Sequence, residues 1–316
     1  MRVVCRSSLE SEYTEEMFAN FLPTDVARLS EATSIALAHQ ITRHAIATPL
    51  IEDPIETAYV HQGAGGTPIL LLHGFDSSVF EFRRLLPLLA DQQATWAVDL
   101  LGFGFTDRPI SASFNPTAIK THLYGFWKTL INQPVILVGA SMGGAAAIDF
   151  ALTYPEAVTQ LVLIDSAGFA AGPAVSKFLV PPLGYLATEF LRQPKVRRQV
   201  SLKAYVDRRL VTADAELCAA LHLQMSGWSR SIIAFTKSGG HNFLSSKISQ
   251  ISQPTLILWG DSDQILGTQD AEQFRDAIPT SQLHWIQHCG HVPHLEQPMI
   301  TAEFIVAHSD SLNSKV

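Results

Sequence analysis

The pattern of apolar and polar residues changes character near residue 56. Beyond Glu56, short continuous apolar runs alternate with amphipathic stretches, which is typical of a parallel sheet wrapped by helices. Strands buried on both faces read as unbroken apolar runs, because neither face meets water. Six runs qualify as such strands: Pro68–Leu72, Thr95–Val98, Val135–Val138, Leu161–Ile164, Thr255–Trp259 and Leu283–Ile286.

The stretches between these runs carry apolar residues at helical spacing. Asn115 and Pro116 form a good helix start, with the Asn as cap and the Pro at the first helical position. Five helices are expected in this part of the chain: Val79–Ala90, Pro116–Ile131, Met142–Tyr154, Gln269–Ile278 and Pro298–His308. The predicted fold class is therefore α/β, with a mostly parallel central sheet flanked by helices.

Two segments depart from this alternation. Residues 1–54 read as a polar lead-in followed by one helix, which we expect to pack against the core. Residues 170–247 show no strong strand, have three prolines near their start and contain several amphipathic helical segments. We expect this segment to be a helical lid, or cap, over the carboxyl edge of the sheet, where open α/β sheets bind ligands. With this lid as an insertion, the α/β core comprises residues 55–169 and 248–316. The alternative is that residues 170–247 are an ordinary run of helices in the body of the fold.

The amino-acid composition indicates what kind of partner the protein binds and in which cellular compartment it acts. Acidic residues outnumber basic ones, 29 to 22, and the net charge is -7, which argues against a nucleic-acid partner because such binding draws on clustered Lys and Arg. The cysteines Cys5, Cys218 and Cys289 are odd in number and far apart, so reduced thiols fit better than a disulfide scaffold. The sequence shows neither a signal-peptide pattern nor a run of ~18 apolar residues. We expect a cytoplasmic protein, not inserted in a membrane, that acts on a small molecule.

A candidate nucleophile follows the third apolar run. Residues 139–143, Gly-Ala-Ser-Met-Gly, match the motif G-x-S-x-G, in which the serine occupies a strained strand-to-helix turn. The glycines are required because a side chain at either position would collide with the neighbouring strand or helix. Small residues at 145–147 let the helix that follows lie close, so Ser141 is the candidate nucleophile.

A serine hydroxyl needs a base that takes its proton. His288, His291 and His294 all follow the last predicted strand. His291 comes after a glycine and before a proline-stiffened turn, which suits a side chain held over the sheet edge. The spacing of the three histidines also admits a metal cluster, although three ligands would have to converge from one short loop.

The base in turn needs a carboxylate that fixes its tautomer. Asp261 and Asp263 follow the run Thr255–Trp259, and Asp165 ends an earlier run. The chain order Ser, Asp, His is that of α/β-hydrolases and both later aspartates satisfy it. The residues alone leave the choice open.

The tetrahedral oxyanion formed by acyl transfer needs hydrogen-bond donors. The Met142 N–H opens the helix after the nucleophile and is the first candidate. The second is the Phe75 N–H, in the loop His73-Gly74-Phe75-Asp76 that follows an early strand. We expect His73 and Asp76 to brace this turn rather than to touch substrate.

These blocks, in this order, resemble the α/β-hydrolase superfamily from about Glu56 to the C-terminus. The matching residues are the oxyanion loop at 73–75, the Asp-Leu-Leu-Gly-Phe-Gly loop at 99–104, the elbow at 139–143, and the acid and histidine blocks at 259–263 and 290–296. The resemblance implies the α/β-hydrolase fold with an inserted helical lid. It maps the acid to Asp263, the base to His291 and the oxyanion donors to Phe75 and Met142, with no metal or organic cofactor. A minority of members place the acid where Asp165 stands.

The resemblance leaves several reactions open. Haloalkane dehalogenases and epoxide hydrolases of this fold use an aspartate at the elbow, so Ser141 excludes their chemistry. We expect hydrolysis of carboxylic esters of small to medium apolar acids through an acyl-enzyme. The alternatives are carbon–carbon bond hydrolases of the meta-cleavage type, cofactor-free perhydrolases, hydroxynitrile lyases and slow-turnover ligand receptors. The carbon–carbon hydrolases share the Ser-Met-Gly-Gly elbow but usually carry a glycine-rich oxyanion loop.

The predicted cap is rich in large apolar residues. We expect most of them to pack the cap onto the core, and some to line an acyl pocket. Trp228, Phe235 and Met225 are the candidates for the pocket wall.

Overall fold

A computed structural model describes residues 18–169 and 182–313 of the chain. Within these residues, eight strands form one sheet in the order β1-β2-β4-β3-β5-β6-β7-β8. Strands β1 and β2 pair antiparallel, β2 pairs antiparallel with β4, and the other neighbours are parallel. The strands are β1 (Thr42–Ile46), β2 (Ile55–Gln62), β3 (Ile69–Leu72), β4 (Thr95–Val98), β5 (Val135–Ala140), β6 (Val158–Ile164), β7 (Thr255–Gly260) and β8 (Ser281–Ile286).

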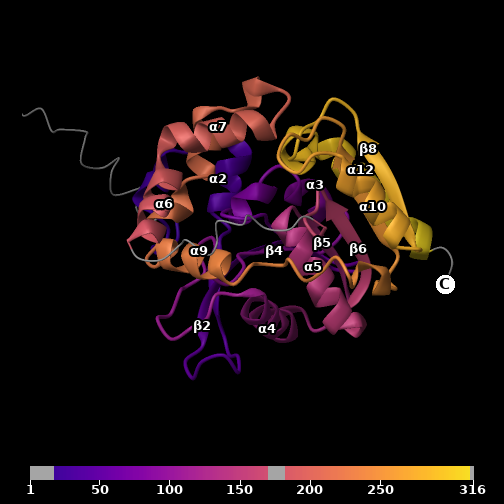
Figure 1. Ribbon diagram of the computed structural model, residues 1–316, viewed down its shortest axis with the longest axis horizontal. Coiled ribbons are helices and arrows are strands. Elements are labelled where there is room, and N and C mark those ends of the chain that lie inside the picture. The colour runs from indigo at the N-terminus through magenta and orange to yellow at the C-terminus, as the bar shows by residue number, and fades with distance from the viewer. Residues whose placement is uncertain (1–17, 170–181, 314–316) are drawn as a thin grey trace, which may run out of the picture.

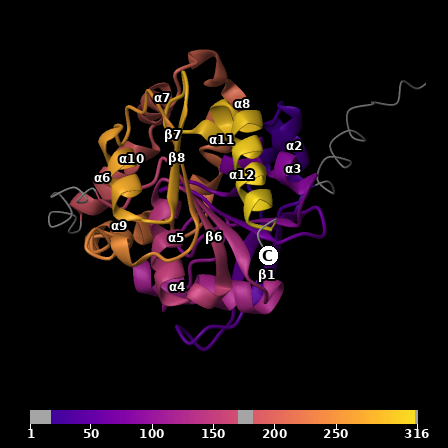
Figure 2. The ribbon, with the colours of Figure 1, turned by 90° about the vertical axis from the view of Figure 1, so that its right-hand side faces the viewer.

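The sheet is covered on both faces, which explains the unbroken apolar runs (Figures 1 and 2). On β3, Leu70 and Leu72 join one apolar cluster and Ile69 and Leu71 join another, because side chains alternate between the faces of a strand. Helices α4 (Pro116–Phe126), α5 (Met142–Thr153) and α10 (Gln269–Ala277) contribute to the first cluster, and α3 (Leu86–Ala90) and α12 (Pro298–Asn313) to the second. The α/β fold class is confirmed.

The expected helices are present with two local differences. The Asn115 side chain accepts the Ala118 N–H at 2.9 Å and caps α4 as expected, but α4 passes into the π-helical turn η3 (Trp127–Ile131). The expected helix at 79–90 is divided into the 3-10 turn η2 (Val79–Phe82) and α3. Pro87 lies in the first turn of α3, where its missing N–H costs no helical hydrogen bond.

The N-terminal segment contains more than the single helix that its sequence pattern predicts. It holds the 3-10 turn η1 (Thr24–Arg28), the short helix α2 (Ala32–Ala38) and strand β1, which extends the sheet edge. In β1 and β2 exposed and buried positions are interspersed, so these two antiparallel strands lack the continuous apolar runs that identify the central ones.

Between β6 and β7 the described chain is helical (Figure 1), and we call this segment the cap. Residues 170–181, where the expected cap begins, and Cys5 lie outside the described residues. The cap consists of α6 (Leu183–Arg192), α7 (Pro194–Ala204), η6 (Arg208–Leu210), α8 (Ala213–Cys218), η7 (Leu221–Gln224) and α9 (Trp228–Lys237). The remaining described elements are η4 (Pro155–Ala157), η8 (Ile248–Gln250) and the short α11 (Pro293–Glu296). No helix in the described ranges has the length and apolarity that a membrane crossing requires.

Candidate active site

Ser141 lies between the end of β5 and the start of α5, with a φ of 52°. This left-handed conformation is uncommon for residues other than glycine and stores strain. A Cβ built on Gly139 would lie well under 3.0 Å from the Gly143 carbonyl oxygen, and one on Gly143 equally close to the Leu72 carbonyl oxygen. The two motif glycines are therefore required by the close approach of β3, β5 and α5, as the sequence predicts.

His291 and Asp263 meet beyond the ends of the last two strands. His291 Nδ1 lies 2.9 Å from Asp263 Oδ2, and both residues are buried, with 8% and 6% of their surfaces exposed. Asp263 Oδ1 also accepts the N–H groups of Ile265, at 2.7 Å, and Leu266, at 3.2 Å. A carboxylate held in this way can orient the imidazole and stabilise its protonated form.

The other two aspartates take different positions. Asp261 accepts the N–H of His288 at 3.1 Å and of Cys289 at 3.3 Å, so it shapes the histidine loop. Asp165 is fully buried and accepts the Gly260 N–H at 3.1 Å. Burial, and then the nearby charge of Asp263, raise the pKa of Asp165 well above its usual range, which indicates a neutral carboxyl group beside the candidate acid.

The three histidines of this loop face different surroundings. His294 Nε2 lies 3.2 Å from Glu81 Oε1 and both side chains are buried, whereas His288 is exposed. His291 points to Asp263. The metal cluster that the spacing admits is therefore not formed by these side chains.

The candidate oxyanion loop runs beside the elbow. Gly74 approaches Ser141 so closely that a Cβ on Gly74 would lie 3.3 Å from the Ser141 Cβ. The Phe75 ring packs on Phe103, with centroids 5.8 Å apart, and on Phe235 of the cap, 5.9 Å apart. In the described chain, neither the Phe75 N–H nor the Met142 N–H donates to a protein acceptor. Both donors remain free for an oxyanion.

His73 and Glu81 hold this loop to the core. His73 Nε2 accepts the Leu100 N–H at 3.1 Å while Nδ1 lies 2.8 Å from the Gly74 carbonyl oxygen, an arrangement that a neutral ring protonated at Nδ1 satisfies. Burial lowers the pKa of His73 to about 4, in agreement with that tautomer. Glu81 accepts the Gly74 N–H at 2.9 Å.

Three of the candidate catalytic residues line one cavity of ≈ 350 Å³, and Asp263 and Met142 lie behind its wall. Ser141, His291 and Phe75 are on its wall together with Glu81. The described contacts include no hydrogen bond between Ser141 Oγ and His291, and bonds of this kind often tighten only when substrate binds. Much of the wall is formed by apolar residues of the cap and of nearby loops: Leu191, Val196, Val200, Ala204, Val211, Ala215, Ala219, Ile265, Val292 and Leu295. Polar residues, among them Arg83 and Arg197, also line it.

The three residues that we expected in the pocket wall do not line this cavity. Trp228 is 1% exposed and its indole N–H donates to Asp76. Phe235 is buried against Phe75 and Phe103. Met225 packs against one of the core clusters. They hold the cap on the core, and the wall comes instead from α6, α7 and α8. The spacing of Val196, Val200 and Ala204, four residues apart on one face of α7, is the signal that could have identified part of it.

Comparisons with known proteins agree with this fold. A family model described as alpha/beta hydrolase fold matches residues 67–298. The alpha/beta hydrolase domain-containing protein VTE7 of Arabidopsis thaliana is 34% identical over 292 residues, which cover 89% of this chain and 87% of that protein. The 2-hydroxy-6-oxo-6-(2'-aminophenyl)hexa-2,4-dienoic acid hydrolase of Metapseudomonas resinovorans is 30% identical over 77% of this chain and 84% of its own.

Solved structures share the fold. A meta-cleavage product hydrolase from Pseudomonas fluorescens IP01 superposes with a TM-score of 0.70 at 24% identity, covering 86% of this chain and 98% of that one. A thermophilic esterase from Thermogutta terrifontis also gives 0.70 at 24% identity, covering 84% and 97%. The same fold is thus found in a meta-cleavage product hydrolase and in an esterase.

Proposed function

Because the chain belongs to the alpha/beta hydrolase fold family, we propose that it is a serine hydrolase of carboxylic esters of small to medium apolar acids. One observation carries the proposal. Ser141, His291 and the oxyanion loop meet at a single cavity whose remaining wall is largely apolar. An apolar wall beside a nucleophile and two free N–H donors suits an uncharged acyl group.

The reaction runs through an acyl-enzyme. As Ser141 Oγ attacks the ester carbonyl carbon, its proton passes to His291 Nε2, and Asp263 stabilises the imidazolium through Nδ1. The negative oxygen of the tetrahedral intermediate accepts the N–H groups of Phe75 and Met142, each such donor being worth about 3 kcal/mol.

Collapse of the intermediate breaks the bond between the carbonyl carbon and the alcohol oxygen. His291 Nε2 gives its proton to that oxygen, and the alcohol leaves. A water molecule then loses a proton to His291 Nε2 as its oxygen attacks the acyl carbon. When the bond between that carbon and Ser141 Oγ breaks, His291 returns the proton to Oγ, and the carboxylic acid leaves. The protein residues supply all of the proton transfers.

A meta-cleavage type hydrolase is the second candidate, and the relatives at 30% identity favour it. One of them acts on a dienoic acid by its name, and such a substrate would bring a carboxylate into the site. Two arginines line the cavity wall. Arg197 donates to Asp76 at 2.7 Å and to the Ala219 carbonyl oxygen at 2.6 Å. Arg83 donates from Nη1 to the Phe80 carbonyl oxygen at 3.2 Å, but its buried Nε and Nη2 have no hydrogen-bond partner among the described residues and are the groups that a carboxylate would meet. The largely apolar remainder of the wall favours the uncharged ester.

The test compares substrates on the same enzyme preparation. We expect sustained turnover of p-nitrophenyl acetate, butyrate and octanoate, with the chain-length profile reporting the size of the cavity. A 2-hydroxy-6-oxo-dienoate should be turned over far more slowly. Preferred turnover of the dienoate would select the second candidate, and a single burst of nitrophenol without further turnover would indicate a ligand receptor.

A further inference from the structure

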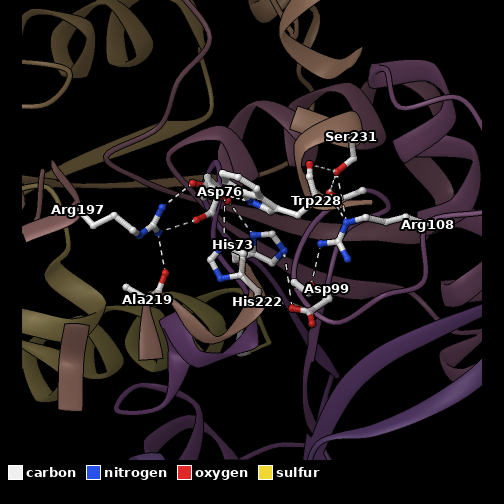
Figure 3. A network of polar contacts seen from close by, with 12 residues as sticks. His73, Asp76, Asp99, Arg108, Arg197, Ala219, His222, Trp228 and Ser231 are labelled. Carbon is white, nitrogen blue, oxygen red and sulfur yellow. Dashed lines mark hydrogen bonds and ion pairs between the residues drawn. The ribbon is translucent and has the colours of Figure 1, made fainter. Parts of the chain in front are cut away.

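Three separate segments of the cap converge on one carboxylate of the core (Figure 3). Asp76 Oδ1 accepts the indole N–H of Trp228, on α9, at 2.7 Å and lies 3.1 Å from Nε2 of His222, on η7. Asp76 Oδ2 accepts from Nη1 of Arg197, on α7, at 2.7 Å. The Asp76 side chain is 11% exposed, so water screens these contacts weakly.

Asp76 follows Phe75, whose N–H is the candidate oxyanion donor. Its φ of 51° lies in the left-handed region, which non-glycine residues keep only where surrounding contacts hold them. Here those contacts come from the cap. The second Arg197 nitrogen donates to the Ala219 carbonyl oxygen at 2.6 Å, so α7 is also tied to the residue that follows α8. The backbone of Asp76 and the position of the cap are thereby linked.

The other side of the loop is held by the core alone. The Gly74 N–H donates to Glu81 on η2, and the Leu100 N–H donates to His73. Neither bond involves the cap. The loop thus has a core-anchored half at residues 73–74 and a cap-anchored half at Asp76, with the Phe75 N–H at the junction. Displacement of the cap would release the second half only.

We propose that Asp76 is a positioning residue through which the cap sets the oxyanion hole. With the cap in place, the donors from Trp228, His222 and Arg197 fix Asp76 and direct the Phe75 N–H toward the oxyanion. When the cap moves away, Asp76 relaxes and this donor is lost, so efficient acyl transfer is confined to the closed cavity. The inference rests on the proposed function, because an oxyanion donor matters only if the site stabilises a tetrahedral intermediate.

The test removes one cap donor at a time. Trp228→Phe deletes a single N–H and keeps an aromatic ring, and Asp76→Asn keeps the shape but removes the charge. Trp127→Phe is the matched control, because Trp127 is also buried and donates its indole N–H to the Gln133 carbonyl oxygen at 2.9 Å, away from the cap and the cavity. Each variant is assayed for kcat and KM on p-nitrophenyl butyrate and for inhibition by an aryl trifluoromethyl ketone, which forms a tetrahedral adduct with an active serine.

A complete loss of an oxyanion donor costs 10²–10³ in kcat, so we expect a partial displacement in Trp228→Phe to lower kcat about 10-fold or more. The KM should change little, and the ketone should bind more weakly by the same factor as kcat falls. Asp76→Asn should show the same pattern with a larger loss of kcat. Trp127→Phe should keep the wild-type kcat and ketone affinity, while its thermal stability should fall about as much as that of Trp228→Phe.

Hydrogen exchange of the peptide covering residues 74–77 gives a readout that does not depend on catalysis. We expect faster exchange in Trp228→Phe and Asp76→Asn than in the wild type or Trp127→Phe. Unchanged kcat, ketone affinity and exchange in both Asp76-network variants would overturn the inference. A wild type that neither hydrolyses esters nor binds the ketone would refute the proposed function instead, and the exchange measurement would then decide whether the cap holds the loop.

Discussion

At the scale of single residues, the two buried carboxyl groups beside His291 differ in their surroundings. Asp263 accepts two backbone N–H groups and contacts His291 Nδ1. Asp165 is fully buried behind it, and burial, followed by the nearby charge of Asp263, raises the pKa of Asp165 well above its usual range. One site thus holds a carboxyl group that orients the base and a second one that burial favours in its neutral form.

This difference predicts the effects of two matched substitutions. Asp263→Asn should lower kcat by about 10⁴-fold, because the amide favours the wrong imidazole tautomer. Asp165→Asn should keep activity within a few-fold, because asparagine resembles the neutral acid and can still accept the Gly260 N–H. Steady-state kinetics on p-nitrophenyl butyrate measure both. A larger loss in Asp165→Asn than in Asp263→Asn would reverse the two assignments.

The sequence contained the candidate triad residues but not the choice among the aspartates. Asp261, Asp263 and Asp165 all follow strands, and strand ends at one sheet edge lie close together in space. Only the family resemblance singled out Asp263, and the 2.9 Å contact with His291 agrees with it. The pocket wall was harder to predict, because it depends on how α6, α7 and α8 pack on the core. We predicted that the pocket wall contains Trp228, Phe235 and Met225. In the structure these residues attach the cap to the core instead.

At the scale of elements, the strand-turn-helix around Ser141 depends on how closely its neighbours approach. Gly143→Ala would place a Cβ against the Leu72 carbonyl oxygen, and backbone cannot move aside as a side chain can. We expect a loss of about 2 kcal/mol or more in the free energy of unfolding, together with loss of activity.

Gly65→Ala is the control for that substitution. Gly65 has a positive φ of 76°, but a Cβ there would meet nothing within 4 Å. Its cost should therefore be about 1 kcal/mol from backbone strain alone. Urea denaturation compares the two variants. Equal losses would mean that the approach of β3 to α5 is not tight.

The elements also show what hydrophobic patterning can detect. All six predicted strands were found. Strands β3 to β7 lie inside the sheet and are buried over most of their length, which produces continuous apolar runs, whereas β8 lies at the edge and is only partly buried. Strands β1 and β2 were missed, since only part of each is buried. The division of the expected helix at 79–90 into η2 and α3 reflects local contacts of the oxyanion loop and Pro87, which helical periodicity alone does not reveal.

At the scale of the whole molecule, the contacts around the oxyanion loop make stability depend on pH. Burial alone would raise the pKa of Glu81, but the hydrogen bond and charge of His294 outweigh it and hold this pKa at about 2, below its ordinary value of 4.5. A carboxyl group with a lowered folded-state pKa stabilises the fold above its unfolded-state pKa, and this contribution is lost as the pH falls toward the folded-state value. Asp76, also at about 2, acts in the same direction.

We therefore expect the thermal midpoint of the wild type to fall as the pH is lowered from about 5 to about 2. Glu81→Gln should be less stable than the wild type at pH 7, and its midpoint should fall less steeply over this range because one titrating group is gone. Thermal unfolding followed by circular dichroism at a series of pH values measures both slopes. Identical slopes would mean that Glu81 does not contribute to acid unfolding.

The account as a whole depends on Ser141 acting as the nucleophile of an acyl-transfer reaction. The most direct test is the hydrolysis of p-nitrophenyl butyrate by the wild type and by Ser141→Ala under the same conditions. The account predicts sustained turnover by the wild type and a loss on the order of 10⁶-fold in kcat for the variant, with thermal stability retained. Turnover that survives in Ser141→Ala would contradict it.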